Sequence, residues 1–224
     1  MKQFIGPVLL LVWKDLLLEI RTKQSLVSLL VFAVLVMLIF NFALNMTPQA
    51  VNMFAPGILW VTFIFAGMLA MSRAFVSEKE RGSLDGLLLC PVSRDVIYYG
   101  KMIGIFLFML VIEAMLLPIF AILFNFSAFS LTLFGIIVLS TFGFSVVGTL
   151  FAAMTVNTRS REVLLPVLFL PIIFPVLIAA VQGSAGAIGG NTTFAADRWI
   201  QLVAVFDIIF VVVCPWVFGL VVEE

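Results

Sequence analysis

Residues 78–101 read EKERGSLDGLLLCPVSRDVIYYGK and carry 8 of the chain's 24 formal charges. Long hydrophobic segments flank them, in a chain of 224 residues that is 64% hydrophobic and 11% charged. Such a composition is typical of a membrane protein with several spans. Because charges this dense must lie in water, we expect the stretch to separate two transmembrane segments.

The middle of this stretch predicts a short helix with an apolar face. Ser83 is a favourable N-cap residue, and Asp85 stands in the first turn, where the helix dipole favours an anion. Leu84, Leu87 and Leu88 are spaced i, i+3 and i+4, so they share one side of the helix. The pattern therefore indicates a capped helix that exposes three leucines.

This short helix is expected to end at Pro91, and Ser93 with Asp95 starts a second helix that runs into the next span. A leucine face held just outside the membrane is suited to a groove on a soluble partner. We therefore predict that residues 73–101 form a cytoplasmic loop that docks on such a partner.

Six segments are long and apolar enough to cross a bilayer, which takes about 20 residues. A mean hydropathy of +1.28 agrees with this number of spans. The segments are 25–44, 55–71, 102–124, 131–156, 163–181 and 204–222. The sequence thus predicts an all-α membrane protein with six transmembrane helices, in which residues 1–224 form a single domain.

The basic residues predict the orientation. Eleven of the 12 Lys and Arg residues precede the first span or follow the second and fourth spans, and Arg198 alone is on the opposite side. Under the positive-inside rule both termini are cytoplasmic. The net charge of zero gives no sign of a nucleic-acid partner.

Two segments outside the spans are expected to lie along the membrane surface. Residues 1–24 have an apolar side that includes Val8 and Val12, with charges elsewhere, which predicts an interfacial helix on the cytoplasmic side. The alternative is that they only anchor the first span. Residues 182–203 begin with a glycine-rich run that predicts a mobile connection, followed by a short interfacial helix at the outer side.

Two acids and three prolines stand inside predicted spans. An ionised acid at mid-bilayer costs about 2.5–3.5 kcal/mol, so Glu113 and Asp207 are expected to face protein or a wet cavity. Glu113 is either functional or a neutral, hydrogen-bonded structural acid, and Asp207 has the further alternative of a place at the outer interface. Pro166, Pro171 and Pro175 predict a bent fifth span that lines a pathway or moves.

The fourth span has small residues at every fourth position. Thr141, Ser145, Thr149 and Ala153 form this row, which allows helix backbones to approach closely in lipid. The row indicates either packing within one subunit or an interface between subunits.

Several kinds of site are missing from the sequence. It contains no G-x-x-x-x-G-K-[ST] motif and no histidine, which excludes nucleotide hydrolysis through a P-loop, Ser-His-Asp catalysis and histidine ligation of zinc or haem. Cys90 and Cys214 are too few for a metal site. We expect neither an enzyme active site nor a metal or cofactor bound by this chain itself.

The stretch 78–101 resembles the membrane subunits of ABC-2 type exporters, in which E-x-E-x-G-[ST]-L-[DE] is followed by L-L, P-[VL]-S-R and G-K. The matching residues are Glu78, Glu80, Gly82, Ser83, Leu84, Asp85, Leu87, Leu88, Pro91, Val92, Ser93, Arg94, Gly100 and Lys101. The resemblance implies a coupling helix that docks on a separate, ATP-binding ATPase subunit. Arg81, within the motif, joins the expected coupling residues.

Longer stretches resemble the CcmB family, the haem exporter protein B membrane component of cytochrome c maturation systems. They are WKDLLLEIRTK (13–23), FNFAL (40–44), APGILWVTFIFAGML (55–69) and REVLLPVLFLPIIFPVLIAA (161–180). The resemblance implies a complex with a CcmA-type ATPase, a CcmC-type haem-handling protein, a small CcmD-type protein and a second copy of the chain. It also implies the cytoplasmic (inner) membrane as location and haem as the ligand transported or handled.

The expected function is therefore that of a permease subunit in c-type cytochrome biogenesis. It couples ATP hydrolysis by a partner either to haem export or to release of a haem-loaded chaperone at the outer face, and the lack of histidine favours release. One alternative is a generic ABC-2 exporter of a lipid, drug or glycan, in which case deletion leaves c-type cytochromes intact. Another is a scaffold for haem-handling proteins, which works without ATP hydrolysis by a partner.

Overall fold

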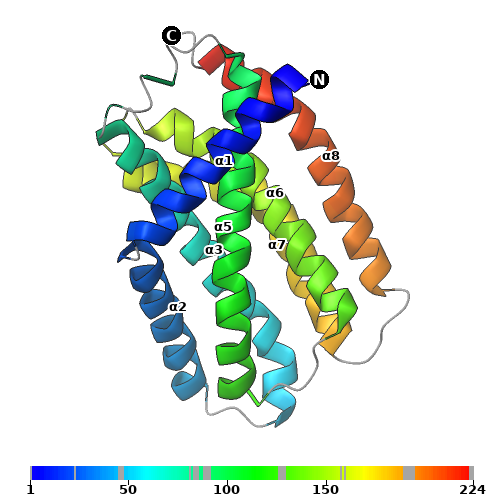
Figure 1. The fold of residues 1–224 in the computed structure, drawn as a ribbon. Helices are drawn as coiled ribbons and strands as arrows, with labels where there is room; N and C mark the ends of the chain where they lie inside the picture. Colours follow the sequence, from blue (N-terminus) through cyan, green and yellow to red (C-terminus); the bar gives the residue numbers. More distant parts are fainter. Residues whose placement is uncertain are drawn as a thin grey trace.

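Long helices make up nearly all of the described chain (Figure 1). The computed structural model describes residues 2–22, 24–44, 48–80, 82, 86–87, 92–125, 130–156, 158, 160–188 and 195–221. The helices are α1 (Lys2–Thr22), α2 (Gln24–Ala43), α3 (Pro48–Glu80), α5 (Arg94–Leu123), α6 (Leu131–Thr155), α7 (Arg161–Ile188) and α8 (Ala195–Val221).

Six of these helices, all except α1, are long and apolar enough to cross a membrane. They coincide with the six predicted spans, so the chain is an all-helical, multi-pass membrane protein. The start of α1 and the end of α8 lie at the same end of the bundle, which we call the terminal end (Figure 1). The end of α3 and the start of α5, on either side of the segment 81–93, lie at this end too (Figure 1).

The helices on either side of that segment are longer than predicted. α3 continues through Glu80 and α5 begins at Arg94, so helix occupies both flanks of the loop expected over residues 73–101. Hydropathy locates the apolar part of a span, whereas the helix itself continues into the polar region as long as its side chains suit it. The expected start of the second helix is confirmed, because Ser93 is the N-cap of α5 and Asp95 stands in its first turn.

The prediction of a mobile connection from residue 182 is wrong for its first part. α7 continues to Ile188, and buried Ser184 accepts a hydrogen bond from Trp60 Nε1 at 2.9 Å. Gly183 lets Ile136 and Trp199 approach the α7 backbone, which explains why a glycine stands inside a helix. The separate outer helix is not found in the described residues either, since α8 is continuous from Ala195.

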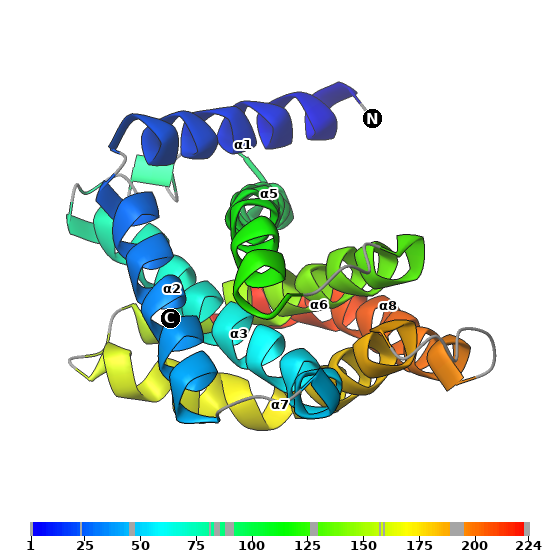
Figure 2. The same cartoon turned by 90° about the horizontal axis from the view of Figure 1, so that it is seen from below.

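α6 is the central helix, in contact with α3, α5, α7 and α8 (Figure 2). Its row of small residues packs within the chain: Thr141, Ser145 and Thr149 are fully buried. The Ser145 and Thr149 hydroxyls donate to the carbonyls four residues earlier, at 2.8 and 2.6 Å, so their burial leaves them paired. These three residues therefore serve packing inside one subunit.

α1 lies across the outside of α5 and has two apolar sides (Figure 2). Val8 and Val12 are buried next to α5, while Leu9 and Trp13 are 61% and 64% exposed. The sequence predicted that the charges of α1 lie on its outward side. Among the described side chains of α1, the charged ones are Lys14 and Asp15, and they bond to residues of α3 and α5 instead. The outward surface of α1 is therefore apolar.

Candidate functional site

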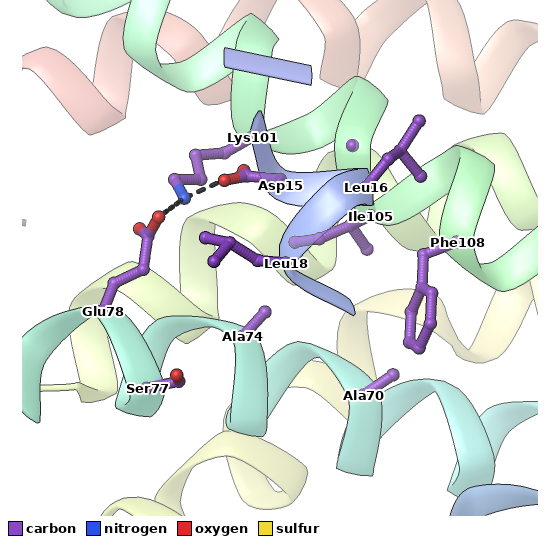
Figure 3. A pocket seen from close by; sticks show the side chains of 11 residues that line it. Asp15, Leu16, Leu18, Ala70, Ala74, Ser77, Glu78, Lys101, Ile105 and Phe108 are labelled. Carbon is purple, nitrogen blue, oxygen red and sulfur yellow. Dashed lines mark hydrogen bonds and ion pairs between the residues drawn. The ribbon is translucent and has the colours of Figure 1, made fainter. Parts of the chain in front are cut away.

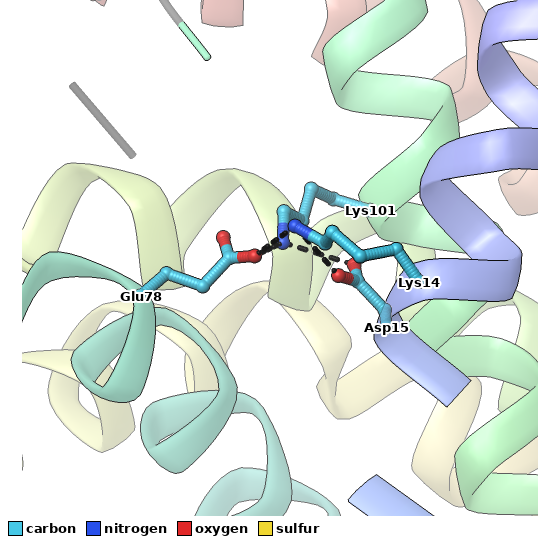
Figure 4. Close-up of polar contacts among 4 residues, drawn as sticks. All are labelled: Lys14, Asp15, Glu78 and Lys101. Carbon is cyan, nitrogen blue, oxygen red and sulfur yellow. Dashed lines mark hydrogen bonds and ion pairs between the residues drawn. The ribbon is translucent and has the colours of Figure 1, made fainter. Parts of the chain in front are cut away.

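Four charged side chains from three helices form a closed ring (Figure 4). Figure 3 shows three of them, Asp15, Glu78 and Lys101, from another side. Lys14 Nζ lies 2.7 Å from Glu78 Oε1 and 3.1 Å from Asp15 Oδ1. Lys101 Nζ lies 2.9 Å from Asp15 Oδ2 and also forms an ion pair with Glu78 Oε1. Cations and anions alternate around this charge ring, which joins α1 to both helices that flank the segment 81–93.

The ring is neutral overall and partly removed from water. The Lys101 and Glu78 side chains are 5% and 8% exposed, whereas those of Lys14 and Asp15 are 38% and 18% exposed. Burial acts to lower the pKa of Lys14, but the hydrogen bond that its ammonium donates to Glu78 and the charges of Asp15 and Glu78 outweigh burial, so the pKa is raised. Each ion in such a cluster depends on its counter-ions, because a buried charge without a partner is strongly destabilising.

Two glycines of α5 allow α1 to reach the ring. A Cβ atom on Gly100 would lie 2.9 Å from Leu11 Cβ, and one on Gly104 would lie 3.5 Å from Asp15 Cβ. The spacing Gly-x-x-x-Gly places both on one side of α5, where small residues permit close helix contact. Lys101 follows the first glycine and so stands at this contact.

Basic residues at the two ends of the segment 81–93 bind the carbonyl ends of α6 and α8. Lys79 Nζ donates to Val156 O at 3.3 Å, and Arg94 Nη1 donates to Gly219 O at 3.0 Å. Cations are favourable at helix C-termini, where carbonyls lack partners within the helix. The segment is therefore tied at its start to α6 and at its end to α8.

Two tyrosines extend these ties along α5. The buried Tyr98 hydroxyl donates to Val146 O of α6 at 2.7 Å, and the Tyr99 hydroxyl donates to Val211 O of α8 at 3.2 Å. The first two turns of α5 are thus bonded to both neighbours.

The structure describes only some of the expected coupling residues. Glu78 belongs to the charge ring, Arg94 bonds to α8 and Glu80 is the last residue of α3. Gly82 has a φ of +64° and donates its N–H to Lys79 O at 3.0 Å, a left-handed residue of the kind that follows many helix ends. Leu87 is half-buried. The others, which lie outside the described residues, are Arg81, Ser83, Leu84, Asp85, Leu88 and Pro91.

The two acids inside the spans are both buried. The Thr141 hydroxyl donates to the Glu113 carboxyl group, with Oγ1 at 2.7 Å from Oε1, which fits the structural alternative for this acid. Asp207 is 4% exposed and lies against Gly143 of α6, where a Cβ atom would collide with its carboxyl group. Asp207 therefore faces protein, as expected, and neither of its carboxyl oxygens has a hydrogen-bond partner among the described residues.

Pro171 and Pro175 are exposed on the outward side of α7, which remains one continuous helix. A role of these prolines in a pathway or a movement stays a prediction. Among the described residues, no three Cys, Asp or Glu side chains are grouped so that they could hold a metal ion.

Sequence reasoning missed most of the charge ring. Lys14 and Asp15 are adjacent charges in an otherwise apolar segment, and Lys101 stands between two glycines four positions apart. Isolated charges in an apolar helix usually pair with other charges of the protein. Their presence in the sequence was therefore the signal that could have predicted an ion-pair cluster. Which residues pair with Lys14 and Asp15 could not be predicted without knowing where α1 packs against α3 and α5.

The sequence of the chain is similar to sequences of known proteins. The sequence model of the CcmB protein family matches residues 7–224. Heme exporter protein B of Pseudomonas aeruginosa is 29% identical over 192 residues, which cover 85% of this chain and 86% of that protein. The protein of the same name from Rhodobacter capsulatus is 31% identical over 170 residues, 75% of this chain and 78% of that one. Because the family match covers nearly the whole sequence, the chain belongs to the CcmB family.

Proposed function

We propose that this chain is the permease subunit of an ABC transporter complex for c-type cytochrome biogenesis. Membership of the CcmB family and relatives named Heme exporter protein B support this role. In the proposal the terminal end faces the cytoplasm, and the segment 81–93 docks there on a CcmA-type ATPase subunit that binds ATP. A CcmC-type protein, a CcmD-type protein, a second copy of this chain and membrane lipid complete the complex.

The observation that carries the coupling role is the charge ring. ATP-driven closure of the partner would push on the segment 81–93, whose two ends continue directly into α3 and α5. Glu78 and Lys101 join these helices to each other and to α1, so the three helices respond as one unit. Lys79 and Arg94 carry the displacement to α6 and α8.

The displacement is proposed to act on haem handling at the outer side rather than on an axial haem ligand in this chain. The sequence contains no histidine, the commonest axial ligand of haem, so a partner would supply it. We therefore favour release of a haem-loaded chaperone over passage of haem through this subunit.

Leu87→Asp tests the docking of the segment. A carboxylate at this half-buried position would have to be desolvated against an apolar groove of the ATPase, so we expect loss of c-type cytochromes with normal membrane levels of the chain. The control is Ser160→Asp, which adds the same charge at an exposed position just before α7, where aspartate is a good N-cap residue. Normal cytochrome content and normal co-purification of the ATPase in Leu87→Asp would contradict the proposal.

A further inference from the structure

Two buried polar side chains lie where α6 and α8 pack side by side (Figure 2). The fully buried Ser140 of α6 lines a small space together with Val203 of α8. One turn further along both helices, the carboxyl group of Asp207 lies against Gly143. The side-chain oxygens of Ser140 and Asp207 have no hydrogen-bond partner among the described residues. These four residues form one contact, which we call the α6–α8 seam.

The α6–α8 seam leaves its polar atoms no room for water. The space at Ser140, which Ala179 and Trp199 also line, is too small for a water molecule. At Gly143 the carboxyl group of Asp207 occupies the place that a Cβ atom would take. Buried carboxyl and hydroxyl groups nearly always have partners, because burying them unpaired costs free energy. The packing of the seam is therefore opposed by two groups that would gain hydrogen bonds in water.

Hydrogen bonds attach α8 to α5, but none joins α8 to α6 in the described parts of these helices. Arg94 of α5 bonds to Gly219 O, and Tyr99 of α5 bonds to Val211 O. Both bonds lie beyond Asp207, in the second half of α8. The first half of α8 can therefore move away from α6 while the second half stays attached to α5.

We propose that the α6–α8 seam has a second, open arrangement, in which α8 is separated from α6 and water forms hydrogen bonds with Asp207 and Ser140. The closed arrangement gains apolar packing and the open one gains hydration, so the chain exchanges between the two. Water enters from the end of the bundle where both helices begin, since Ser140 is about 14 Å along α6 at 1.5 Å per residue. A push carried by Arg94 to α8 shifts the seam toward the open arrangement, and only this last step rests on the proposed function.

The first experiment measures water access to Ser140→Cys in the full-length chain, with Cys90 and Cys214 replaced by alanine. The chain is placed in lipid nanodiscs and treated with 2-(trimethylammonium)ethyl methanethiosulfonate, which reacts with ionised thiols in water. We expect Ser140→Cys to be labelled. Ser145→Cys, equally buried but on another side of α6, should stay unlabelled. No labelling of Ser140→Cys, or equal labelling of both variants, would overturn the proposal.

The second experiment tests what favours opening. Leucine has nearly the shape of aspartate but no polar atom, so Asp207→Leu removes the hydration that stabilises the open arrangement. Labelling of Ser140→Cys should slow about tenfold, the factor that one hydrogen bond of ordinary net strength supplies. The control Ile208→Leu, on the exposed side of α8, should leave the rate unchanged. An unchanged or faster rate in Asp207→Leu would refute the proposal.

A third measurement separates this inference from the proposed function. In the complex with the ATPase subunit, ATP should speed the labelling of Ser140→Cys. Labelling that occurs in the isolated chain but does not respond to ATP in the complex would support the open arrangement and contradict the proposed transmission to α8.

Discussion

Replacement of Lys101 by methionine is the sharpest perturbation of the charge ring. The side chain is 5% exposed, and its ammonium contacts Asp15 Oδ2 at 2.9 Å as well as Glu78. Methionine keeps the apolar stem, so the change removes charge with little loss of packing. Two carboxylates then share Lys14 as their one remaining ring cation, and breaking such a buried pair costs about 3–5 kcal/mol.

A double variant shows whether this cost arises from the ring itself. Glu78→Gln alone leaves an excess cation, whereas Glu78→Gln combined with Lys101→Met restores neutrality and keeps the pair of Lys14 and Asp15. The double variant should therefore be about 1.5–3 kcal/mol more stable than the sum of the two single effects predicts. The assay is the free energy of unfolding from reversible denaturation in mixed detergent micelles.

Two results would refute this reasoning. The first is additivity of the two single effects within about 0.5 kcal/mol, which is the behaviour of independent sites. The second is an equal loss of stability in the control variant Lys79→Met, because that exposed lysine contacts a helix-end carbonyl and should contribute at most about 1 kcal/mol.

The same unfolding assay checks two further predictions. Gly143→Ala forces a methyl group against Asp207 and should cost about 1–3 kcal/mol, whereas Gly135→Ala, where the added carbon meets open space, should be neutral or stabilising by up to about 1 kcal/mol. Equal effects of the two alanines would contradict this. Tyr98→Phe removes a fully buried hydrogen bond and should cost about 0.5–1.5 kcal/mol, more than Tyr99→Phe, whose longer bond is only partly buried. A larger loss in Tyr99→Phe would show that α8 rather than α6 is the stronger tie.

The number and order of the spans could be predicted from the sequence because each span is an apolar run long enough to cross a bilayer. Their ends could not, since hydropathy does not register a helix that continues into the polar region, as α3 does to Glu80. Glycines misled the prediction for a different reason. Gly183 resembles a loop residue in sequence, but in the bundle it is the point at which Ile136 approaches α7.

Only part of the site could be predicted from the sequence. The motif drew attention to Glu78 and Arg94, yet it could not indicate that they bond to other helices of the same chain. α1 is apolar on two sides, with Val12 facing inward and Trp13 outward, so its pattern did not reveal which side packs. The side of α1 that packs determines where the Lys14 side chain lies, so its partners could not be predicted either.

The charge ring also has a consequence for how the protein is made. Asp15 and Lys101 are 86 positions apart, and Lys14 and Glu78 are 64 apart. At a synthesis rate of about 5–20 residues per second, roughly 4–17 s separate the emergence of Asp15 from that of Lys101. Until Lys101 emerges, Asp15 has no counter-ion from α5, and the surface of α5 on which α1 packs has not yet been synthesised. Docking of α1 is thus a late event of biogenesis, which follows insertion of the third span instead of guiding it.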